Sequence, residues 1–252
     1  MDPQLATEIS AGLGAAAGLA LAAGGCAYAA LSPASRIFGE SFIAPRLPGQ
    51  LALTFDDGPN PAWTPRLLDV LANYGVRATF FLVGSHAYSE PALVRRIVAA
   101  GHLVGNHSWS HPNLALTQGS RIEEELLRTS CTLEQITSRP VLFFRPPFGA
   151  RRPIVLHTAR DLGMTPVLWN AMTSDWSNPS AESIAHHLVR SIDRAERSGS
   201  AANVVLHDAS HLDRAAWRAP SVNAVSQLAK RYKFTHRFVT LDEWSESPAA
   251  KL

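Results

Sequence analysis

Two adjacent aspartates end the first strand-like segment of the chain, in the stretch LALTFDDGPN at residues 51–60. Neighbouring carboxylates repel each other, and an ordinary Asp-Gly-Pro turn does not need two acids. A divalent cation would relieve that repulsion, because one aspartate could bind the metal while the other acts as a general base. The pair Asp56 and Asp57 is therefore a candidate for metal-assisted chemistry.

Two histidines four residues apart, His107 and His111 in NHSWSH, supply a second kind of metal ligand. On a helical turn this spacing places both rings on the same face. Two histidines and one carboxylate form a common open zinc site, with a position left for water and substrate. The pair alone is more readily explained as an exposed helix face, but the aspartates at another strand end favour a metal site.

These candidates are positioned by a regular alternation of strand-like and helix-like segments. The expected strands are residues 51–55, 78–83, 102–106, 141–145, 165–169, 203–207 and 237–241. The expected helices are 64–74, 93–98, 120–136, 153–162, 181–198 and 221–232, with starts marked by Thr64–Pro65 and by a Ser120–Glu123 capping box. Such alternation predicts an α/β fold with a parallel sheet, and about seven units predict a barrel or near-barrel.

Ionisable residues lie at the end of one expected strand after another. They are Asp56, Asp57, His107, His111, Arg145, Asp175, His207 and Asp208. In a parallel α/β barrel the carboxyl ends of all strands open onto one face, where catalytic groups gather. Residues that are distant in sequence are therefore expected to share one mouth.

Three of these residues have chemistry that complements the metal site. Arg145, in RPPFG, can hold a carboxylate through its planar guanidinium. Asp175 can orient His207 through one ring nitrogen, which leaves the other to protonate a leaving group. Asp208 ranks below Asp175 for this role, and Arg151 and Arg152 are expected to be solvated residues at a helix start.

Composition excludes several classes of protein and site. A formal net charge of +2, with no run of Lys or Arg, gives no basis for a nucleic-acid partner. The hydrophobic fraction of 46% allows a sizeable core. Cys26 and Cys131 form no C-x-x-C pattern and are expected to be unpaired, so a thiolate zinc site is excluded. The absence of G-x-S-x-G argues against a serine hydrolase.

The N-terminal residues 11–32 are uncharged and composed of small or apolar side chains. They are long enough to cross a bilayer once, as an anchor or as a signal peptide with an Ala27-Tyr28-Ala29 cleavage site. A soluble Ala-rich helix is the alternative. Arg36 and Arg46 follow the segment and favour a cytoplasmic catalytic portion, but so few charges leave the orientation open.

The motifs TFDDGP, HSWSH, RPPFG, DW and LHD, in this order, closely resemble those of the polysaccharide deacetylases, the NodB-type family 4 carbohydrate esterases. The resemblance covers roughly residues 50–245. It implies a distorted (β/α) barrel, the NodB homology fold, and one divalent metal. Zinc is expected, with cobalt or nickel as alternatives. It also implies hydrolysis of an N- or O-acetyl group on a sugar polymer.

The resemblance implies a role for each matching residue. Asp56 is similar to the catalytic base, and the metal ligands would be Asp57, His107 and His111. Arg145 would tether the base, Asp175 would tune the catalytic histidine, and His207 would be the general acid. Substrate contacts are expected from Trp176, Leu206, Pro146 and Phe148. Met172 departs from the pattern, since many relatives carry aspartate there, and this leaves the substrate subtype open.

We therefore expect a metal-dependent hydrolase that removes N-acetyl groups from peptidoglycan or a chitin-like polymer. Deacetylation or deformylation of a lipid-linked sugar, O-deacetylation of xylan, and a glycan-binding pseudoenzyme are the alternatives. The expected domains are 1–33 as signal or anchor, 34–49 as linker, 50–245 as catalytic domain and 246–252 as tail. A monomer in the bacterial cell envelope is expected, either anchored through residues 11–32 or exported.

Overall fold

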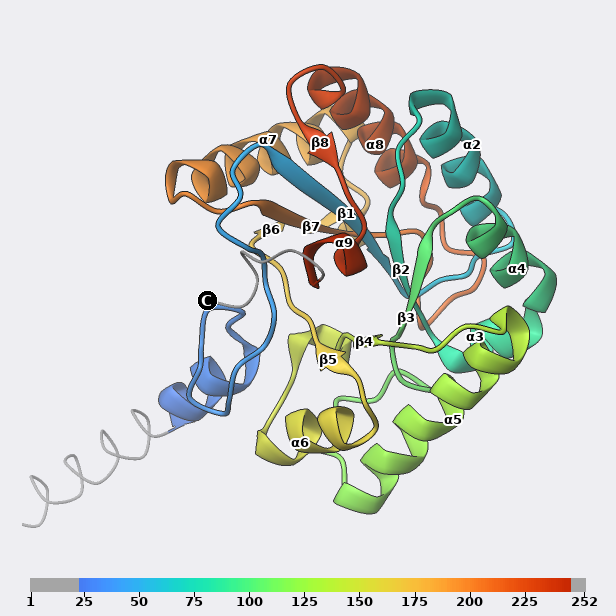
Figure 1. Cartoon of the computed structure of the whole chain (residues 1–252), viewed down its shortest axis with the longest axis vertical. Helices are drawn as coiled ribbons and strands as arrows, with labels where there is room; N and C mark the ends of the chain where they lie inside the picture. Colours follow the sequence, from blue (N-terminus) through green and yellow to red (C-terminus); the bar gives the residue numbers. More distant parts are fainter. Residues whose placement is uncertain (1–22, 246–252) are drawn as a thin grey trace, which may run out of the picture.

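Eight parallel strands form one curled sheet in the protein, whose computed structural model describes residues 23–245 (Figure 1). The order along the sheet is β5-β4-β3-β2-β1-β7-β6, and β8 pairs with the beginning of β1. The strands are β1 Gln50–Asp56, β2 Thr79–Leu82, β3 Leu103–Asn106, β4 Phe143–Phe144, β5 Thr165–Pro166, β6 Ala171–Met172, β7 Ala202–His207 and β8 Arg237–Phe238. The expected α/β fold, a distorted barrel, is confirmed.

Helices surround the outer face of this sheet, as Figure 1 shows. They are α2 Thr64–Tyr74, α3 Gly84–Ser89, α4 Pro91–Ala99, α5 Gly119–Thr137, α6 Pro153–Asp161, α7 Ala181–Arg197 and α8 Ala219–Tyr232. The short α9, Leu241–Ser245, lies within the curl of the sheet and places the buried Trp244 there. The main core is the apolar layer between the strands and the outer helices.

Strand alternation decides which side chains of β1 face the helices and which face the inside of the curl. Leu51, Leu53 and Phe55 belong to the core under the helices, whereas Ala52 belongs to the inner apolar cluster. Because successive side chains point to opposite faces of a sheet, Asp56 shares the inner face with Ala52. The same rule applies on β7, and both strands therefore direct polar residues toward the interior at their carboxyl ends.

The curl is left open between β5 and β6, since no ladder joins these two strands within the described residues. Phe42 occupies this gap by donating its N–H to Pro166 and accepting from the N–H of Leu168, both at 2.8 Å. Farther along, the carbonyl of Pro45 accepts from the N–H of Ala201 at 2.9 Å. Residues 34–49, expected as a linker, thus contribute main-chain hydrogen bonds to the sheet.

Several local expectations were wrong in detail. Helix α3 was not expected, because six residues of the sequence GSHAYS carry no helical apolar pattern. Thr64 is the first residue of α2, and its hydroxyl accepts from the N–H of Asn60 at 2.7 Å instead of capping the helix. Segments 165–169 and 237–241 each form only a two-residue strand at their start.

The expected capping box at Ser120 and Glu123 is also wrong, because Ser120 lies inside α5 and no side chain caps this helix. A one-sided contact related to a capping box is present at the start of α9. There the Glu243 carboxylate accepts from both the N–H and the hydroxyl of Thr240, each at 3.1 Å.

The N-terminal segment contacts the barrel through Arg151. This residue is fully buried, so its expected solvent exposure is wrong. Its guanidinium donates to the carbonyls of Ala30, Ser32 and Ser35 at 3.2, 2.6 and 3.0 Å. Residues 23–31 are helical, and these bonds fasten the chain that follows them to the barrel.

Most of the apolar segment at residues 11–32 lies outside the described residues, which begin at 23. From residue 23 to 245, none of the helices combines the length and the hydropathy required to span a bilayer. Cys26 and Cys131 are both unpaired and exposed.

Candidate metal and catalytic site

Asp56 and Asp57 are both buried, yet their carboxylates contact different partners. Asp56 is the last residue of β1, and its inward side chain meets Arg145. Asp57 has a positive φ of 73°, so the chain leaves the strand conformation at this residue. Its carboxylate instead meets the imidazoles of His107 and His111. The change of backbone conformation between the two residues therefore separates two adjacent acids.

The two histidines reach Asp57 from an irregular loop, not from the helical turn that their spacing suggested. Ser108 and His111 both have positive φ, at 63° and 57°. The side chain of Asn106 holds this loop by accepting from the N–H of Ser108 at 2.8 Å and donating to the carbonyl of Leu126 at 2.8 Å. The loop is thereby fastened to α5.

Two further elements fix the same loop. The first amides of α3 donate to it, from Gly84 to the carbonyl of Ser108 at 2.9 Å and from Ser85 to that of Trp109 at 3.1 Å. Glu125 of α5 accepts from both the N–H and the hydroxyl of Ser110 at 2.7 Å. With these contacts the loop has a defined conformation without helical hydrogen bonds.

Asp57, His107 and His111 satisfy the requirements of a divalent metal site. One ligand atom from each lies within 4.8 Å of the others, and the residues are buried. Asp57 Oδ1 is 3.1 Å from His111 Nε2 and 3.5 Å from His107 Nε2. Among residues 23–245, no group donates a hydrogen bond to this buried oxygen. His107 Nδ1 lies 2.8 Å from the carbonyl of Arg145, which requires the proton on Nδ1 and leaves Nε2 free for a metal.

The protonation states of these ligands also suit a cation. Burial would raise the pKa of Asp57, but contacts with the imidazoles of His107, His111 and His211 outweigh it and hold that pKa well below its usual range. Burial lowers the pKa of His111 to about 4, which keeps the ring neutral at pH 7. Metal ligands must be a deprotonated carboxylate and neutral imidazoles.

Arg145 lies beneath the site and is completely buried. Its Nη1 donates to Asp56 Oδ1 at 2.8 Å and to the hydroxyl of Thr54 at 2.6 Å. The guanidinium also lies over the ring of Phe81, at 4.2 Å from its centroid. Burial lowers the pKa of Arg145, and the charge of Asp56 opposes that shift. This ion pair fixes the orientation of the Asp56 carboxylate.

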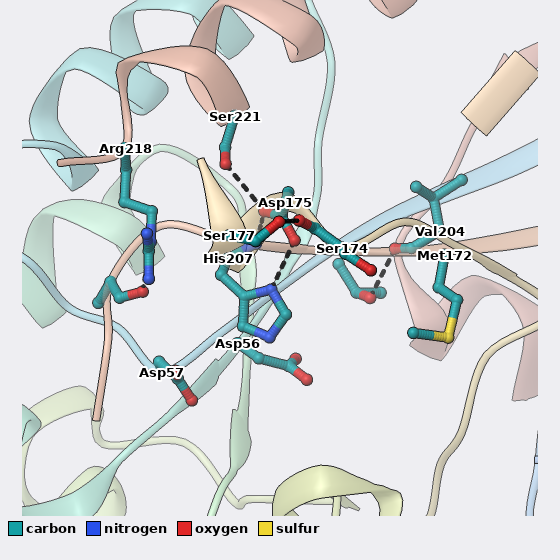
Figure 2. Close-up of polar contacts among 12 residues, drawn as sticks. Asp56, Asp57, Met172, Ser174, Asp175, Ser177, Val204, His207, Arg218 and Ser221 are labelled. Carbon is teal, nitrogen blue, oxygen red and sulfur yellow. Dashed lines mark hydrogen bonds and ion pairs between the residues drawn. The ribbon is translucent and has the colours of Figure 1, made fainter. Parts of the chain in front are cut away.

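Asp175 holds His207 through two hydrogen bonds and is itself held by a third from Ser221 (Figure 2). Asp175 Oδ1 lies 2.8 Å from His207 Nδ1, and Oδ2 accepts from the N–H of His207 and the hydroxyl of Ser221, both at 2.8 Å. Burial alone would lower the pKa of His207, but the charge and hydrogen bond of Asp175 raise it to about 9. The free edge of the ring faces Asp56 in Figure 2.

A cavity of about 410 Å³ unites these groups. It is lined by Asp56, Asp57, His107, His111, Phe148, Trp169, Trp176, Val205, His207, Ser210, His211, Leu212 and Arg218. Arg145 and Asp175 support it from behind through their contacts with Asp56 and His207.

Two expected substrate contacts do not line this cavity. Leu206 is fully buried in the core under the helices, because its neighbours Val205 and His207 occupy the inner face of β7. Pro146 is buried, and its carbonyl accepts from the N–H of Gly149 at 2.9 Å. Val205 takes the position at the cavity that was expected for Leu206.

His211 and Arg218 also line the cavity, although their sequence positions did not single them out. Both lie in the loop between β7 and α8, where Arg218 Nε donates to the carbonyl of Ala209 at 2.7 Å. The spacing of His207 and His211 repeats that of His107 and His111, and this repetition was the available signal. Met172 lies beside the cavity wall, and its sulfur accepts from Trp169 Nε1 at 2.9 Å.

Sequence comparison places this arrangement among known proteins. A family model described as polysaccharide deacetylase matches residues 45–167. The chain is 36% identical over 195 residues to a peptidoglycan-N-acetylglucosamine deacetylase of Bacillus cereus, in an alignment that covers 77% of this chain and 86% of the relative. The chain belongs to the polysaccharide deacetylase family.

Two further comparisons agree with this assignment. A chitooligosaccharide deacetylase of Sinorhizobium fredii is 37% identical over 182 residues, covering 70% of this chain and 82% of the relative. The solved structure of a peptidoglycan N-acetylglucosamine deacetylase superposes with a TM-score of 0.73 at 32% identity, covering 81% of this chain and 91% of that one. The fold and the family are thus supported by sequence and by structure.

Proposed function

We propose that the protein is a metal-dependent deacetylase that removes N-acetyl groups from an N-acetylhexosamine polymer of the peptidoglycan or chitin type. One observation carries this proposal. A carboxylate, a three-residue metal site and a protonated histidine meet in one cavity of about 410 Å³. The relatives named peptidoglycan and chitooligosaccharide deacetylases support the substrate class.

Asp57, His107 and His111 would hold the metal, which we propose to be zinc, with cobalt or nickel able to substitute. A carboxylate and two imidazoles form a ligand set typical of zinc and leave further coordination positions open. A bound cation of this kind polarises a carbonyl group and lowers the pKa of bound water to about 7.

Asp56 is proposed as the general base. Its Oδ1 is held by Arg145, while Oδ2 points toward the metal site, 3.9 Å from His107 Nε2. A carboxylate in this position can accept a proton from the attacking water as the water oxygen bonds to the acetyl carbon. Arg145 holds the carboxylate in this orientation through its hydrogen bond to Oδ1.

His207 is proposed as the general acid. Because Asp175 raises its pKa to about 9, the ring carries the proton at neutral pH. Nδ1 is engaged by Asp175, so Nε2 is the atom available to protonate the departing amine. When the C–N bond breaks, acetate leaves from the carbonyl side, and the sugar retains a free amino group.

The apolar part of the cavity is proposed to receive the acetyl methyl group. The Trp176 ring lies 5.4 Å from the His207 ring, between centroids, and Val205 lines the wall beside it. Phe148 also lines the cavity and is half exposed, and its ring centroid lies 4.7 Å from that of His111. With the methyl group in this apolar part, the amide bond of the substrate would lie near the carboxylate of Asp56 and the imidazole of His207.

We propose a location where envelope glycans are accessible, with residues 11–32 as an anchor or signal, and a monomeric catalytic unit. We also propose that this unit begins before residue 50, since Phe42 and Pro45 hydrogen-bond into the barrel.

A panel of substrates tests the function. Full-length protein loaded with Zn²⁺ would be assayed for acetate release and new amino groups on peptidoglycan, chitooligosaccharides, acetylxylan and a lipid-linked N-acetylated sugar. We expect release from peptidoglycan or chitooligosaccharides, with one amino group formed for each acetate. Release from acetylxylan alone, or from the lipid-linked sugar alone, would contradict the proposed substrate class.

A further inference from the structure

His211 contacts two of the three candidate metal ligands. Its ring is stacked on that of His111, with centroids 3.9 Å apart and planes inclined by 19°. Phe148 packs edge-on against the His211 ring, with the two ring centroids 5.3 Å apart. His211 is therefore enclosed between a candidate ligand and the cavity wall, with 23% of its side chain exposed.

The second contact is with the Asp57 carboxylate. The backbone N–H of His211 lies 3.3 Å from Asp57 Oδ2, and Nδ1 of its ring lies 3.4 Å from the same oxygen. The other oxygen, Oδ1, faces His107 and His111. The two oxygens of Asp57 thus have separate environments, one directed at the ligand set and one at His211.

His211 is not itself a member of the ligand set. Across residues 23–245, the cluster whose ligand atoms lie within 4.8 Å of one another consists of Asp57, His107 and His111. His211 can therefore act on a bound cation through its contacts with Asp57 and His111. Partners of this kind orient metal ligands, and their removal typically costs about 10–100-fold in metal affinity.

We propose that His211 is a positioning residue of the metal site, an inference that rests on the metal-dependent function proposed above. By holding Oδ2, it restricts Asp57 to binding through Oδ1 alone. By stacking on His111, it restricts rotation of that ring. A carboxylate bound through one oxygen leaves more of the coordination sphere for water and substrate than one bound through two.

Three variants separate the two side-chain contacts of His211, while its backbone N–H is kept in all of them. His211→Ala removes both the ring and Nδ1, His211→Phe retains a stacking ring, and His211→Asn retains a side-chain N–H donor without the ring. His187→Ala is the matched control, because His187 is an exposed histidine on α7. The unfolding temperature of each metal-free protein shows that the comparison is made between folded chains.

The first readout is the affinity for Zn²⁺, measured on full-length protein by competition with a chromophoric chelator. We expect His211→Ala to bind one ion about 10–100-fold more weakly, with His211→Phe and His211→Asn between it and the wild type. His187→Ala should match the wild type. An affinity within twofold of wild type for His211→Ala would overturn the proposal, and loss of all binding would make His211 a ligand instead.

The second readout is the visible absorption of the Co²⁺-substituted protein, which reports coordination number without substrate. His211→Phe should show weaker absorption than wild type, because Asp57 then gains freedom to bind through both oxygens. An unchanged spectrum in His211→Phe and His211→Ala would contradict the role assigned to Oδ2. If the wild type binds no metal, the proposed function itself has failed, which is a separate result.

Discussion

Asp56 and Asp57 are adjacent in the chain, yet the groups that surround each carboxylate suit a different task. The carboxylate of Asp56 contacts the guanidinium of Arg145, whereas that of Asp57 contacts the imidazoles of His107 and His111. Because the partners differ, substitution of the two residues should have separable effects.

Asp56→Asn should retain the metal and lower kcat by about 10²–10⁴-fold, since the amide cannot accept the proton of water. Asp57→Asn should instead lower metal affinity, because a neutral amide replaces the anionic ligand. Metal content by atomic emission, measured beside acetate release, checks both. If Asp56→Asn lost the metal while Asp57→Asn kept the wild-type metal content, the roles of base and metal ligand would be reversed.

The pH dependence of turnover should report the Asp175–His207 pair. Because the pKa of His207 is raised to about 9, its ring loses the proton as the pH rises through that range. A bound cation lowers this pKa, so the proton is then lost at lower pH. Asp175→Asn removes the charge that raises this pKa, so the alkaline limb of kcat/KM should move further to lower pH. If the alkaline limb of kcat/KM stayed at the same pH in Asp175→Asn, His207 would not be the group that this limb reports.

Much of the site could be predicted from residue types at strand ends, because parallel strands bring those ends together. His207 and Asp175 are 32 residues apart in sequence and still form a hydrogen bond. His211 was not predicted, because its four-residue spacing from His207, although it repeats that of His107 and His111, does not by itself distinguish a site residue from a surface histidine. Leu206 was expected at the cavity but faces the outer helices, because the sequence of β7 does not show which of its two alternating faces lies inside the curl.

At the scale of elements, the loop carrying the histidines shows where periodicity misleads. Their spacing indicated a helical turn, whereas the loop has two residues with positive φ. Its conformation is imposed by Asn106, by the first amides of α3 and by Glu125. These are tertiary contacts, which local spacing does not encode.

The segment before β1, residues 34–49, was expected as a linker because of its Pro, Gly and Ser residues. Phe42 and Pro45 make main-chain hydrogen bonds in the gap of the barrel, and Arg151 holds the carbonyls preceding them. Main-chain pairing of this kind needs no particular side chain and leaves little signal in the sequence.

Arg151→Met should loosen this attachment. The substitution removes charged donors to the carbonyls of Ser32 and Ser35, and we expect a loss of about 3 kcal/mol in the free energy of unfolding. Denaturant unfolding and limited proteolysis of the full-length chain measure it. Arg139→Met, at an exposed position, is the control, and equal stability of the two variants would contradict the structural role.

At the scale of the whole molecule, the carboxyl ends of the strands bring the candidate metal ligands, the Asp56 carboxylate and the His207 imidazole into a single cavity, while the outer helices supply the core that holds the strands in place. The family relationship and this arrangement together lead to one central claim, that the chain hydrolyses N-acetyl groups only when its site carries a metal.

Titration of metal back into stripped protein tests this claim most directly. Full-length chain treated with a chelator would receive Zn²⁺ stepwise while acetate release from N-acetylated chitooligosaccharide or peptidoglycan is followed. The account predicts no release from the stripped protein, and a rise that saturates at about one ion per chain. Full acetate release from metal-free protein would contradict it.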